Sequence, residues 1–376
     1  MDLAFTREEE AFRAEARAWL RAHVPASPLP SLETGEGFAA HRAWEAELAA
    51  DRWSVVNWPS EYGGRDAGIV NWLVFEEEYY AAGAPGRVGQ NGVSLLAPTL
   101  FDHGTPAQRA RVLPSMATGE VIWAQAWSEP EAGSDLASLR SKGVRTQGGW
   151  LLSGQKTWSS RAAFADRAFG LFRTDPDTPG PHQGLTYLMF DLRAPGVTVR
   201  PIRRLDGKPA FAELFLDEVF VPDEDVIGEP GQGWRIAMST AGNERGLMLR
   251  SPGRFLAAAD RLYALWQAQG SPAPARTRVA DALIGARAYQ LFTFAAASRF
   301  LSGESIGPES SLNKVFWSEY DIALTETALD LLGEEEDPDW SERYVFALAG
   351  PIYAGTNEIQ RDIIAERLLG LPKGRR

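Results

Sequence analysis

The spacing of apolar residues divides the chain into a helical part, a strand-rich part and a second helical part. Apolar positions recur every three or four residues up to about residue 119, which is typical of helices that bury one face. Short apolar runs without that spacing follow, and helical spacing then returns. We therefore predict an N-terminal helical domain over residues 1–119, a central β domain over 120–228 and a C-terminal helical domain over 229–376.

Local signals place the helices of the first part. Thr6 and Glu9 fit a capping box, in which each side chain accepts a hydrogen bond from a backbone amide at the helix start. Thr105 followed by Pro106 predicts a second capped helix, with proline at the first helical position and an end near Gly119. The other helices expected here cover about residues 39–50 and 69–82.

The middle part has the pattern of an antiparallel β unit. Two apolar runs around residues 147–149 predict a hairpin. Further strand-like runs cover residues 169–172, 185–190, 197–202 and 213–222. Short strands without helices between them favour a barrel or a sandwich. In the last part we expect helices over about residues 233–268, 277–301 and 309–332, and two more after an acidic loop at 334–339.

Composition excludes several classes of chemistry. The 376 residues contain no cysteine, which excludes disulfides, zinc–thiolate sites, iron–sulfur clusters and a cysteine nucleophile. The four histidines are not paired at ligand spacing, so no metal site is expected. A net charge of −12 disfavours nucleic acid and anionic membranes as partners. Without a signal peptide or a membrane-spanning run, we expect a cytoplasmic protein.

Three stretches concentrate candidate chemistry. Residues 126–135 combine hydroxyls, acids and a glycine, which suits a polar ligand but also an ordinary capped turn. Residues 154–160 place a tryptophan among polar residues, where it can stack on a flat cofactor ring or cap the core. Residues 352–361 contain a helix break and a new helix start, whose free amides can bind an anion or a carbonyl oxygen. A plain helix cap explains this last stretch as well.

In this order and spacing, the three stretches resemble the acyl-CoA dehydrogenase family of flavoproteins. The motifs Ser-Glu-Pro-x-Ala-Gly-Ser-Asp at 128–135 and Tyr-x-Gly-Thr-x-Glu-Ile-Gln-Arg at 353–361 are the specific family features. The resemblance covers essentially the whole chain. It implies an α+β fold that is mostly α, with an N-terminal helical domain, a central antiparallel β-barrel-like domain and a C-terminal four-helix bundle. Family members are usually tetramers.

The resemblance also implies FAD as the cofactor, bound without a Gly-x-Gly-x-x-Gly motif. Trp158 and Ser160 match positions that pack against and hydrogen-bond the flavin ring, while the backbone before Ser128 meets that ring. The full set of implied cofactor-binding residues is Gln125, Trp127, Ser128, Trp158, Ser160, Thr356 and Glu358. The implied substrate-binding residues are Ser134, Arg245, Tyr353 and Gly355.

The reaction that the resemblance implies is α,β-dehydrogenation of an acyl-CoA thioester to the trans-2-enoyl-CoA. A carboxylate removes the α-proton while the β-hydride passes to flavin N5, and an electron-transferring flavoprotein takes the electrons. Because the α-proton is weakly acidic, the enolate-like oxygen needs preorganised donors, each worth about 10²–10³ in rate. The protein donor implied here is the backbone amide of Ala354. The base must be a desolvated carboxylate with a raised pKa.

The position of that base departs from the commonest family pattern. Many members carry it between the tyrosine and glycine of Tyr-x-Gly-Thr, where this chain has Ala354. A subset similar to isovaleryl- and long-chain acyl-CoA dehydrogenases carries it on an earlier helix, directly before an arginine. Residues 237–245 align with that helix without a gap and put Glu244 at the base position. The alternative is that Glu244 is a solvated or arginine-paired helix residue.

Two family motifs that complete the FAD site across a subunit boundary are missing. Residues 270–276 lack Arg-x-x-Phe-Gly, and residues 333–337 replace a Gly-Gly-x-Gly segment. In this respect the chain resembles a bacterial subgroup that includes steroid side-chain dehydrogenases, some of them α2β2 assemblies. A homo-oligomer (dimer or tetramer) and a heterotetramer therefore both remain open. So do a non-catalytic or half-site partner subunit and an acyl-CoA oxidase.

Overall fold

The computed structural model describes residues 4–245, 251–304 and 307–374, apart from the side chains of residues 243–245. The chain forms two compact units. The helical unit comprises Met1–Ala26, Ala67–Ala84 and Arg245–Arg376, and the sheet unit comprises Ser27–Asp66 and Pro85–Glu244. We predicted three domains, with boundaries after residues 119 and 228. These boundaries differ from the limits of the two units, and the three domains stay a prediction.

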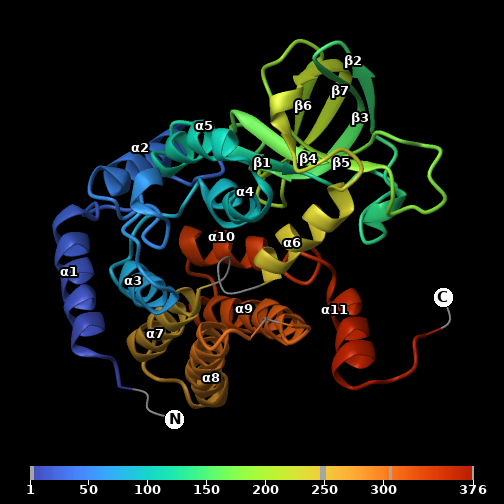
Figure 1. Cartoon of the computed structure of the whole chain (residues 1–376). Helices are drawn as coiled ribbons and strands as arrows, with labels where there is room; N and C mark the ends of the chain where they lie inside the picture. The colour runs from blue at the N-terminus through green and yellow to red at the C-terminus, as the bar shows by residue number, and fades with distance from the viewer. Residues whose placement is uncertain (1–3, 246–250, 305–306, 375–376) are drawn as a thin grey trace. The chain divides into compact units, whose positions relative to one another are not determined.

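The helical unit is built from helices that pack pairwise along their lengths (Figure 1). Its helices are α1 (Arg7–His23), α3 (Ile69–Ala81), α7 (Pro252–Ala268), α8 (Arg276–Leu301), α9 (Ser310–Leu332), α10 (Pro338–Ala347) and α11 (Asn357–Ile363). Helices α7, α8 and α9 pack on one another, α3 packs on α7, and α1 packs on α3. Their shared core contains Phe255, Leu262, Tyr289 and Trp317, all of them buried.

The capped helix starts predicted at Thr6 and Thr105 are confirmed, and one helix prediction was wrong. The Thr6 hydroxyl accepts a hydrogen bond from the Glu9 amide, and the Glu9 carboxylate accepts one from the Thr6 amide, which confirms the capping box. The single helix expected over 233–268 is instead two helices, α6 (Gly233–Arg245) and α7. Ser251 caps α7 by accepting from the amide of Gly253, and a proline occupies its first position. Both are helix-start signals, so the apolar spacing alone misled the prediction.

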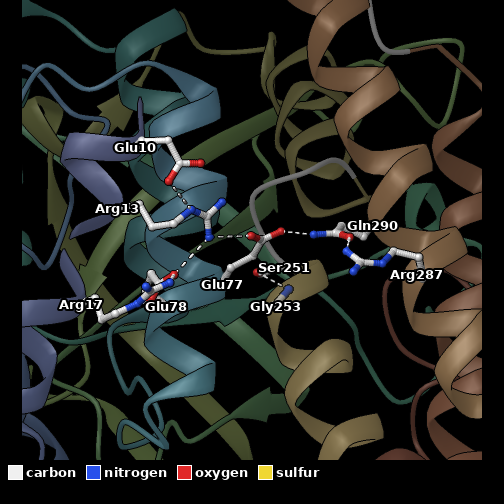
Figure 2. Close-up of polar contacts among 9 residues, drawn as sticks. All are labelled: Glu10, Arg13, Arg17, Glu77, Glu78, Ser251, Gly253, Arg287 and Gln290. Carbon is white, nitrogen blue, oxygen red and sulfur yellow. Dashed lines mark hydrogen bonds and ion pairs between the residues drawn. The ribbon is translucent and has the colours of Figure 1, made fainter. Parts of the chain in front are cut away.

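A polar network joins three helices of the helical unit, α1, α3 and α8 (Figure 2). The Arg13 guanidinium on α1 donates to Glu77 and to Glu78 on α3, each at 3.1 Å. Arg17 donates two hydrogen bonds of 2.7 Å to Glu78. Glu77 also accepts a hydrogen bond from Gln290 on α8. These polar groups therefore link α3 to α1 on one side and to α8 on the other.

The sheet unit consists of one eight-stranded sheet and the helices that precede and follow its strands in the chain. Its helices are α2 (Gly35–Ala50), α4 (Ala97–His103), α5 (Pro106–Ala117) and α6. The strands are β1 (Trp123–Ala126), β2 (Lys142–Thr146), β3 (Gly149–Ser160), β4 (Arg167–Arg173), β5 (Leu185–Asp191), β6 (Val197–Ile202), β7 (Phe211–Pro222) and β8 (Val226–Ile227). Their order is β6-β7-β3-β2-β4-β5-β8, with β1 beside β4. The predicted β2–β3 hairpin is confirmed.

Most strand pairs are antiparallel, as predicted, but β1 and β2 both pair with β4 in parallel. Strand β4 is buried on both faces. Its residues Phe169 and Leu171 belong to one core cluster, and Ala168 and Phe172 to the other, as the two-residue period of a strand requires. The first cluster also takes Leu113 from α5 and residues from α4 and α6. The sheet is therefore apolar on both faces at β4 and β5, which is why these two strands read as nearly continuous apolar runs.

The predicted fold class, α+β and mostly α, is confirmed. Among the helices of the described ranges, none is long and apolar enough to cross a membrane. The described histidine, aspartate and glutamate side chains nowhere form a group of three that could hold a metal ion.

Candidate functional site

A β-bulge turns Trp158 out of the sheet. Lys156 pairs with Leu214 of β7 and Ser159 pairs with Ala212, so β3 carries one extra residue in this interval. Without it, the two-residue period would point Trp158 inward, on the same side as Lys156. With it, Ser159 is buried and the Trp158 side chain is 60% exposed. Trp158 has a positive φ of 59°, an uncommon conformation for a bulky residue. Its indole meets the ring of Phe211 edge-on at 5.9 Å.

The segment after β1 lies directly beside this bulge. The amide of Thr157 donates a 2.8 Å hydrogen bond to the carbonyl oxygen of Ser128. The indole N–H of Trp127 donates to the hydroxyl of Tyr187 at 3.3 Å, so the Trp127 side chain is held in the core. Gln125 lies within β1 and is half-buried. The structure thus brings the stretches around residues 125–128 and 157–160 together. That they form one ligand site stays a prediction.

The remaining predicted residues of the sheet unit lie at the edges of these two segments. Ser160 ends β3 and pairs with Phe211, and its side chain is half-buried. Ser134 is exposed in the turn after β1. No hydrogen bond of the described residues joins Ser134 to residues 157–160, so its place near the substrate stays a prediction.

A fully buried ion pair lies beneath these segments, and the sequence reasoning missed it. The Lys156 ammonium is 2.8 Å from Oε1 of Glu129. Burial lowers the pKa of Lys156 to about 8, against the opposing effect of Glu129. Burial alone would raise the pKa of Glu129, but the Lys156 charge and hydrogen bonds lower it overall. Both residues therefore carry charge at neutral pH. The only sign of this pair in the sequence is that Glu129 and Lys156 lie within the candidate stretches 126–135 and 154–160.

In the helical unit, the predicted residues form a tight turn between α10 and α11. Ala354 and Gly355 both have left-handed backbones, with φ of 56° and 76°. For Ala354 this conformation costs about 1–2 kcal/mol. A Cβ at Gly355 would come within 2.5 Å of the Gln360 side-chain nitrogen and would have to displace it, and the positive φ also favours glycine there. Tyr353 packs against Trp317 of α9, with ring centroids 5.9 Å apart. Because of these two left-handed residues, the backbone amides of the turn have a different orientation from those of an ordinary helix end.

Thr356 caps α11, as predicted, because its hydroxyl accepts a hydrogen bond from the amide of Ile359. Glu358 is exposed in the first turn, where its own amide and the Thr356 hydroxyl lower its pKa. A carboxylate at this position repels a second anion, which the free amides of a helix start would otherwise attract. The approach of a cofactor phosphate to this turn therefore stays a prediction.

Buried polar residues that the sequence analysis missed anchor this turn. Lys314 of α9 is fully buried and donates a 2.8 Å hydrogen bond to the side-chain oxygen of Asn357. Gln360 is also fully buried, and its side-chain nitrogen donates to the carbonyl oxygen of Ala354 at 3.0 Å. Its Oε1 has no hydrogen-bond partner among the described residues. Gln360 belongs to the Tyr-x-Gly-Thr motif, so the motif itself was the signal.

The helix that carries the predicted base is anchored within the sheet unit. Glu244 and Arg245 form the end of α6, but their side chains lie outside the described residues. One turn earlier, the buried Thr240 hydroxyl is 2.7 Å from that of Thr99 and 3.3 Å from that of Tyr187. Tyr187 is the partner of Trp127, so this chain of hydroxyls connects α6 with the segment after β1.

The residues of the sheet unit fit a flavin. An isoalloxazine ring is flat, with apolar faces and polar edges, so it can take an aromatic side chain against a face and hydroxyl or amide groups at its edges. Trp158 offers the aromatic side chain and Ser128 and Ser160 offer hydroxyls, and the Thr157–Ser128 hydrogen bond ties the two segments together.

Comparison with known proteins gives the family. The chain matches three family models in succession: the acyl-CoA dehydrogenase N-terminal domain over residues 6–120, the middle domain over 124–219 and the C-terminal domain over 231–369. The acyl-CoA dehydrogenase IpdE1 of Mycobacterium tuberculosis is 36% identical over 387 residues, covering 98% of this chain and 99% of that protein.

Solved structures agree. The Tcur3481-Tcur3483 steroid ACAD is 27% identical, with a TM-score of 0.88 over 100% of both chains. The ChsE4-ChsE5 complex from Mycobacterium tuberculosis is 27% identical, with a TM-score of 0.86 over 100% of both chains. The chain therefore belongs to the acyl-CoA dehydrogenase family, and the predicted resemblance is confirmed. It is an oxidoreductase of that family.

Proposed function

We propose that this protein catalyses the FAD-dependent α,β-dehydrogenation of an acyl-CoA thioester to the trans-2-enoyl-CoA and passes the electrons to an electron-transferring flavoprotein. The observation that carries the proposal is the exposed Trp158 at the β3 bulge, tied to the Ser128 segment, in a chain that matches the family throughout. FAD, when bound, supplies the acceptor for the β-hydride.

In this proposal, one unit holds the cofactor ring and the base. Trp158 covers a face of the ring, and Ser128, Ser160 and the amides of 125–127 bind its edges. Thr356 and Glu358 bind the ribityl and pyrophosphate part. Glu244 removes the α-proton, since Ala354 occupies the place where many family members carry the acid. Thr99 and Tyr187 support this role by fixing the preceding turn of α6 through Thr240.

The turn at 353–355 has the proposed role of stabilising the thioester oxygen. The Ala354 amide donates to that oxygen as negative charge develops, and Tyr353 and Gly355 line the path of the acyl chain. Ser134 and Arg245 bind other parts of the substrate. The strained Ala354 backbone supports this proposal, because left-handed non-glycine residues cluster at functional sites.

For the substrate, we propose a bulky, steroid-derived acyl-CoA. A relative that covers the full chain is a steroid ACAD, and the missing Arg-x-x-Phe-Gly motif matches the subgroup that the sequence resembles. The decisive test is anaerobic flavin bleaching with short, branched, long and steroidal acyl-CoAs. Bleaching by the steroidal thioester at least tenfold faster than by the others supports the substrate. Equal or faster bleaching by a short linear thioester contradicts it while leaving the reaction intact.

A second candidate is a half-site partner subunit. Residues 270–276, where the family carries its cross-subunit arginine, instead contain a 3-10 turn at Ala273–Ala275 and the start of α8. Exposed apolar residues lie seven positions apart on α8, with Ile284 67% and Leu291 44% exposed, as on a helix face that meets another chain. The ChsE4-ChsE5 relative is itself a complex.

The visible spectrum of the purified protein separates the two candidates. A yellow protein with one flavin per chain, reduced by an acyl-CoA, supports the enzyme. A colourless protein that becomes flavin-loaded only with a second chain supports the half-site subunit. A colourless protein that binds no FAD in any assembly contradicts both. The oligomer, homomeric or heteromeric, is measured on the same samples by light scattering.

A further inference from the structure

Lys156 of β3 is saturated by three oxygens, two from the segment after β1 and one from β4. Its Nζ donates to Oε1 of Glu129 at 2.8 Å, to the carbonyl oxygen of Leu171 at 2.8 Å and to that of Trp127 at 3.3 Å. An ammonium has three N–H donors, so each finds an acceptor. The ring of Phe172 lies 4.9 Å from Nζ. Because the side chain is fully buried, these oxygens replace the solvation that a surface lysine takes from water.

Glu129 extends the same network to a fourth segment. Its Oε2 accepts a 2.6 Å hydrogen bond from the amide of Arg140, and its Oε1 accepts one of 2.9 Å from the amide of Ser141. Its own backbone exchanges two hydrogen bonds with Ala132, at 3.0 and 3.1 Å, closing the turn of the Ser-Glu-Pro motif. The pair therefore ties this turn to strands β3 and β4 and to the segment before β2.

Burial of such a pair is not explained by stability. Replacing a buried ion pair with apolar residues of similar volume is often neutral or stabilising, because desolvation offsets most of the attraction. The sheet unit has an extensive apolar core without it. The pair instead fixes a position. The Lys156 ammonium holds the Trp127 carbonyl oxygen in place relative to strand β3, whereas apolar packing alone would let that carbonyl move.

The fixed segments are the two that we expect to meet the flavin. Lys156 stands two residues before Trp158, and the carbonyl oxygen of Trp127 stands one residue before Ser128. The Thr157 amide, between Lys156 and Trp158, donates to the Ser128 carbonyl oxygen. We propose that Lys156, with Glu129 as its counter-charge, is a positioning residue that sets the distance between the Ser128 segment and Trp158 and so shapes the flavin site. This inference rests on the proposed function.

The test compares three variants with the wild type: Lys156→Met, Glu129→Gln and the double variant. Met has nearly the length of lysine, but it removes the ammonium donor from the Trp127 and Leu171 carbonyls and leaves the Glu129 carboxylate without its counter-charge. We expect Lys156→Met to lower the unfolding temperature of the apoprotein, to weaken FAD binding about tenfold or more and to shift the visible flavin spectrum at saturating FAD. The readouts are FAD titration of the apoprotein, the spectrum and the flavin reduction potential.

The double variant separates positioning from stability. It removes the unpaired buried charge, so we expect the unfolding temperature to recover while the FAD affinity, the spectrum and the potential stay altered. Recovery of all of them to wild-type values would overturn the proposal, since the pair would then act on stability alone. If Lys156→Met does not fold, Glu129→Gln carries the same comparison, because it removes one charge without changing the shape of the side chain.

Asp225→Asn is the matched control. Asp225 is a buried carboxylate of the same unit, held by Arg111 and Arg167 at 2.6 Å each, at the β8 end of the sheet. We expect it to lower the unfolding temperature without changing FAD affinity more than about twofold. Unchanged FAD binding, spectrum and potential in Lys156→Met, with a yellow wild type, would overturn this inference alone. A wild type that binds no FAD would overturn the proposed function, and this inference with it.

Discussion

The Gln360 side chain holds the carbonyl oxygen of Ala354 at 3.0 Å and that of Gly355 at 3.4 Å. Gln360 comes from the second turn of α11 and is fully buried, so it restrains the turn from inside the helical unit. Two successive left-handed residues would otherwise relax to a more favourable backbone. The motif glutamine therefore fixes the turn whose amide we propose as the donor to the thioester oxygen.

Replacing Gln360 with leucine is expected to lower kcat about tenfold with a smaller change in KM. The substitution removes both hydrogen bonds to the turn and leaves its carbonyls unpaired, so the Ala354 amide loses its fixed direction. The loss should be smaller than the 10²–10³ of a deleted oxyanion donor, because the amide itself remains. Steady-state rates with the best acyl-CoA measure it. Gln267→Leu, on the exposed side of α7, is the control and should leave kcat unchanged.

Glu244→Gln tests the base. The variant should retain FAD but lose about 10²-fold or more of the substrate-dependent flavin bleaching, the scale of general-base removal. Stopped-flow spectroscopy under anaerobic conditions measures this rate. Glu229→Gln, an exposed glutamate of the loop before α6, should bleach like the wild type. Bleaching at the wild-type rate in Glu244→Gln would show that the base lies elsewhere.

Trp158→Ala tests the flavin-facing bulge. Loss of the indole should weaken FAD binding about tenfold, which corresponds to about 1.4 kcal/mol of stacking and burial. Trp158→Phe should restore most of the affinity, because a smaller aromatic ring still covers the flavin. Fluorescence titration of the apoprotein gives the dissociation constants. Phe220→Ala removes a 50%-exposed aromatic residue on β7 and should have no effect. Equal affinities for the wild type and Trp158→Ala would contradict the proposed ring position.

The sequence predicted features that depend on neighbouring residues. Capping boxes, the β2–β3 hairpin and the start of α11 each follow from a few consecutive positions, and the structure contains them. The family motifs identified the stretches around Ser128, Trp158 and Ala354. Of these, the structure brings the first two together within the sheet unit.

Features that depend on distant partners were not predictable. The exposure of Trp158 follows from a bulge whose extra residue is visible only in the register with β7. Lys156 and Glu129 lie 27 positions apart, and a buried lysine looks like a surface lysine in a sequence. The end of α6 and the start of α7, in contrast, could have been predicted from neighbouring residues. Ser251 and Pro252 are a helix-start signal, but we predicted one helix because the apolar spacing continues across them.

A last prediction concerns the stability of the helical unit. Burial alone would raise the pKa of Glu78, but the hydrogen bonds from Arg17 and Arg13 outweigh it and lower the pKa (Figure 2). The unfolded chain has a glutamate pKa of about 4.3. Below that value the unfolded state binds a proton at Glu78 more readily than the folded state does, so the free energy of unfolding decreases as the pH falls. The contribution of Glu78 is therefore complete above about pH 4.3 and is lost as the pH falls through the lower folded value.

Glu78→Gln should reveal this pH dependence in urea unfolding. The variant should unfold at a lower urea concentration than the wild type between pH 6 and 8, because Arg13 and Arg17 lose their shared carboxylate. The difference should start to shrink as the pH falls below the unfolded glutamate value of about 4.3 and should vanish below the lower folded pKa, where the wild-type carboxylate is neutral as well. Glu8→Gln, exposed in the first turn of α1, should change stability by less than about 0.5 kcal/mol at either pH. A difference that stays constant from pH 7 to pH 3 would show that packing, and not the charge of Glu78, holds α1 against α3.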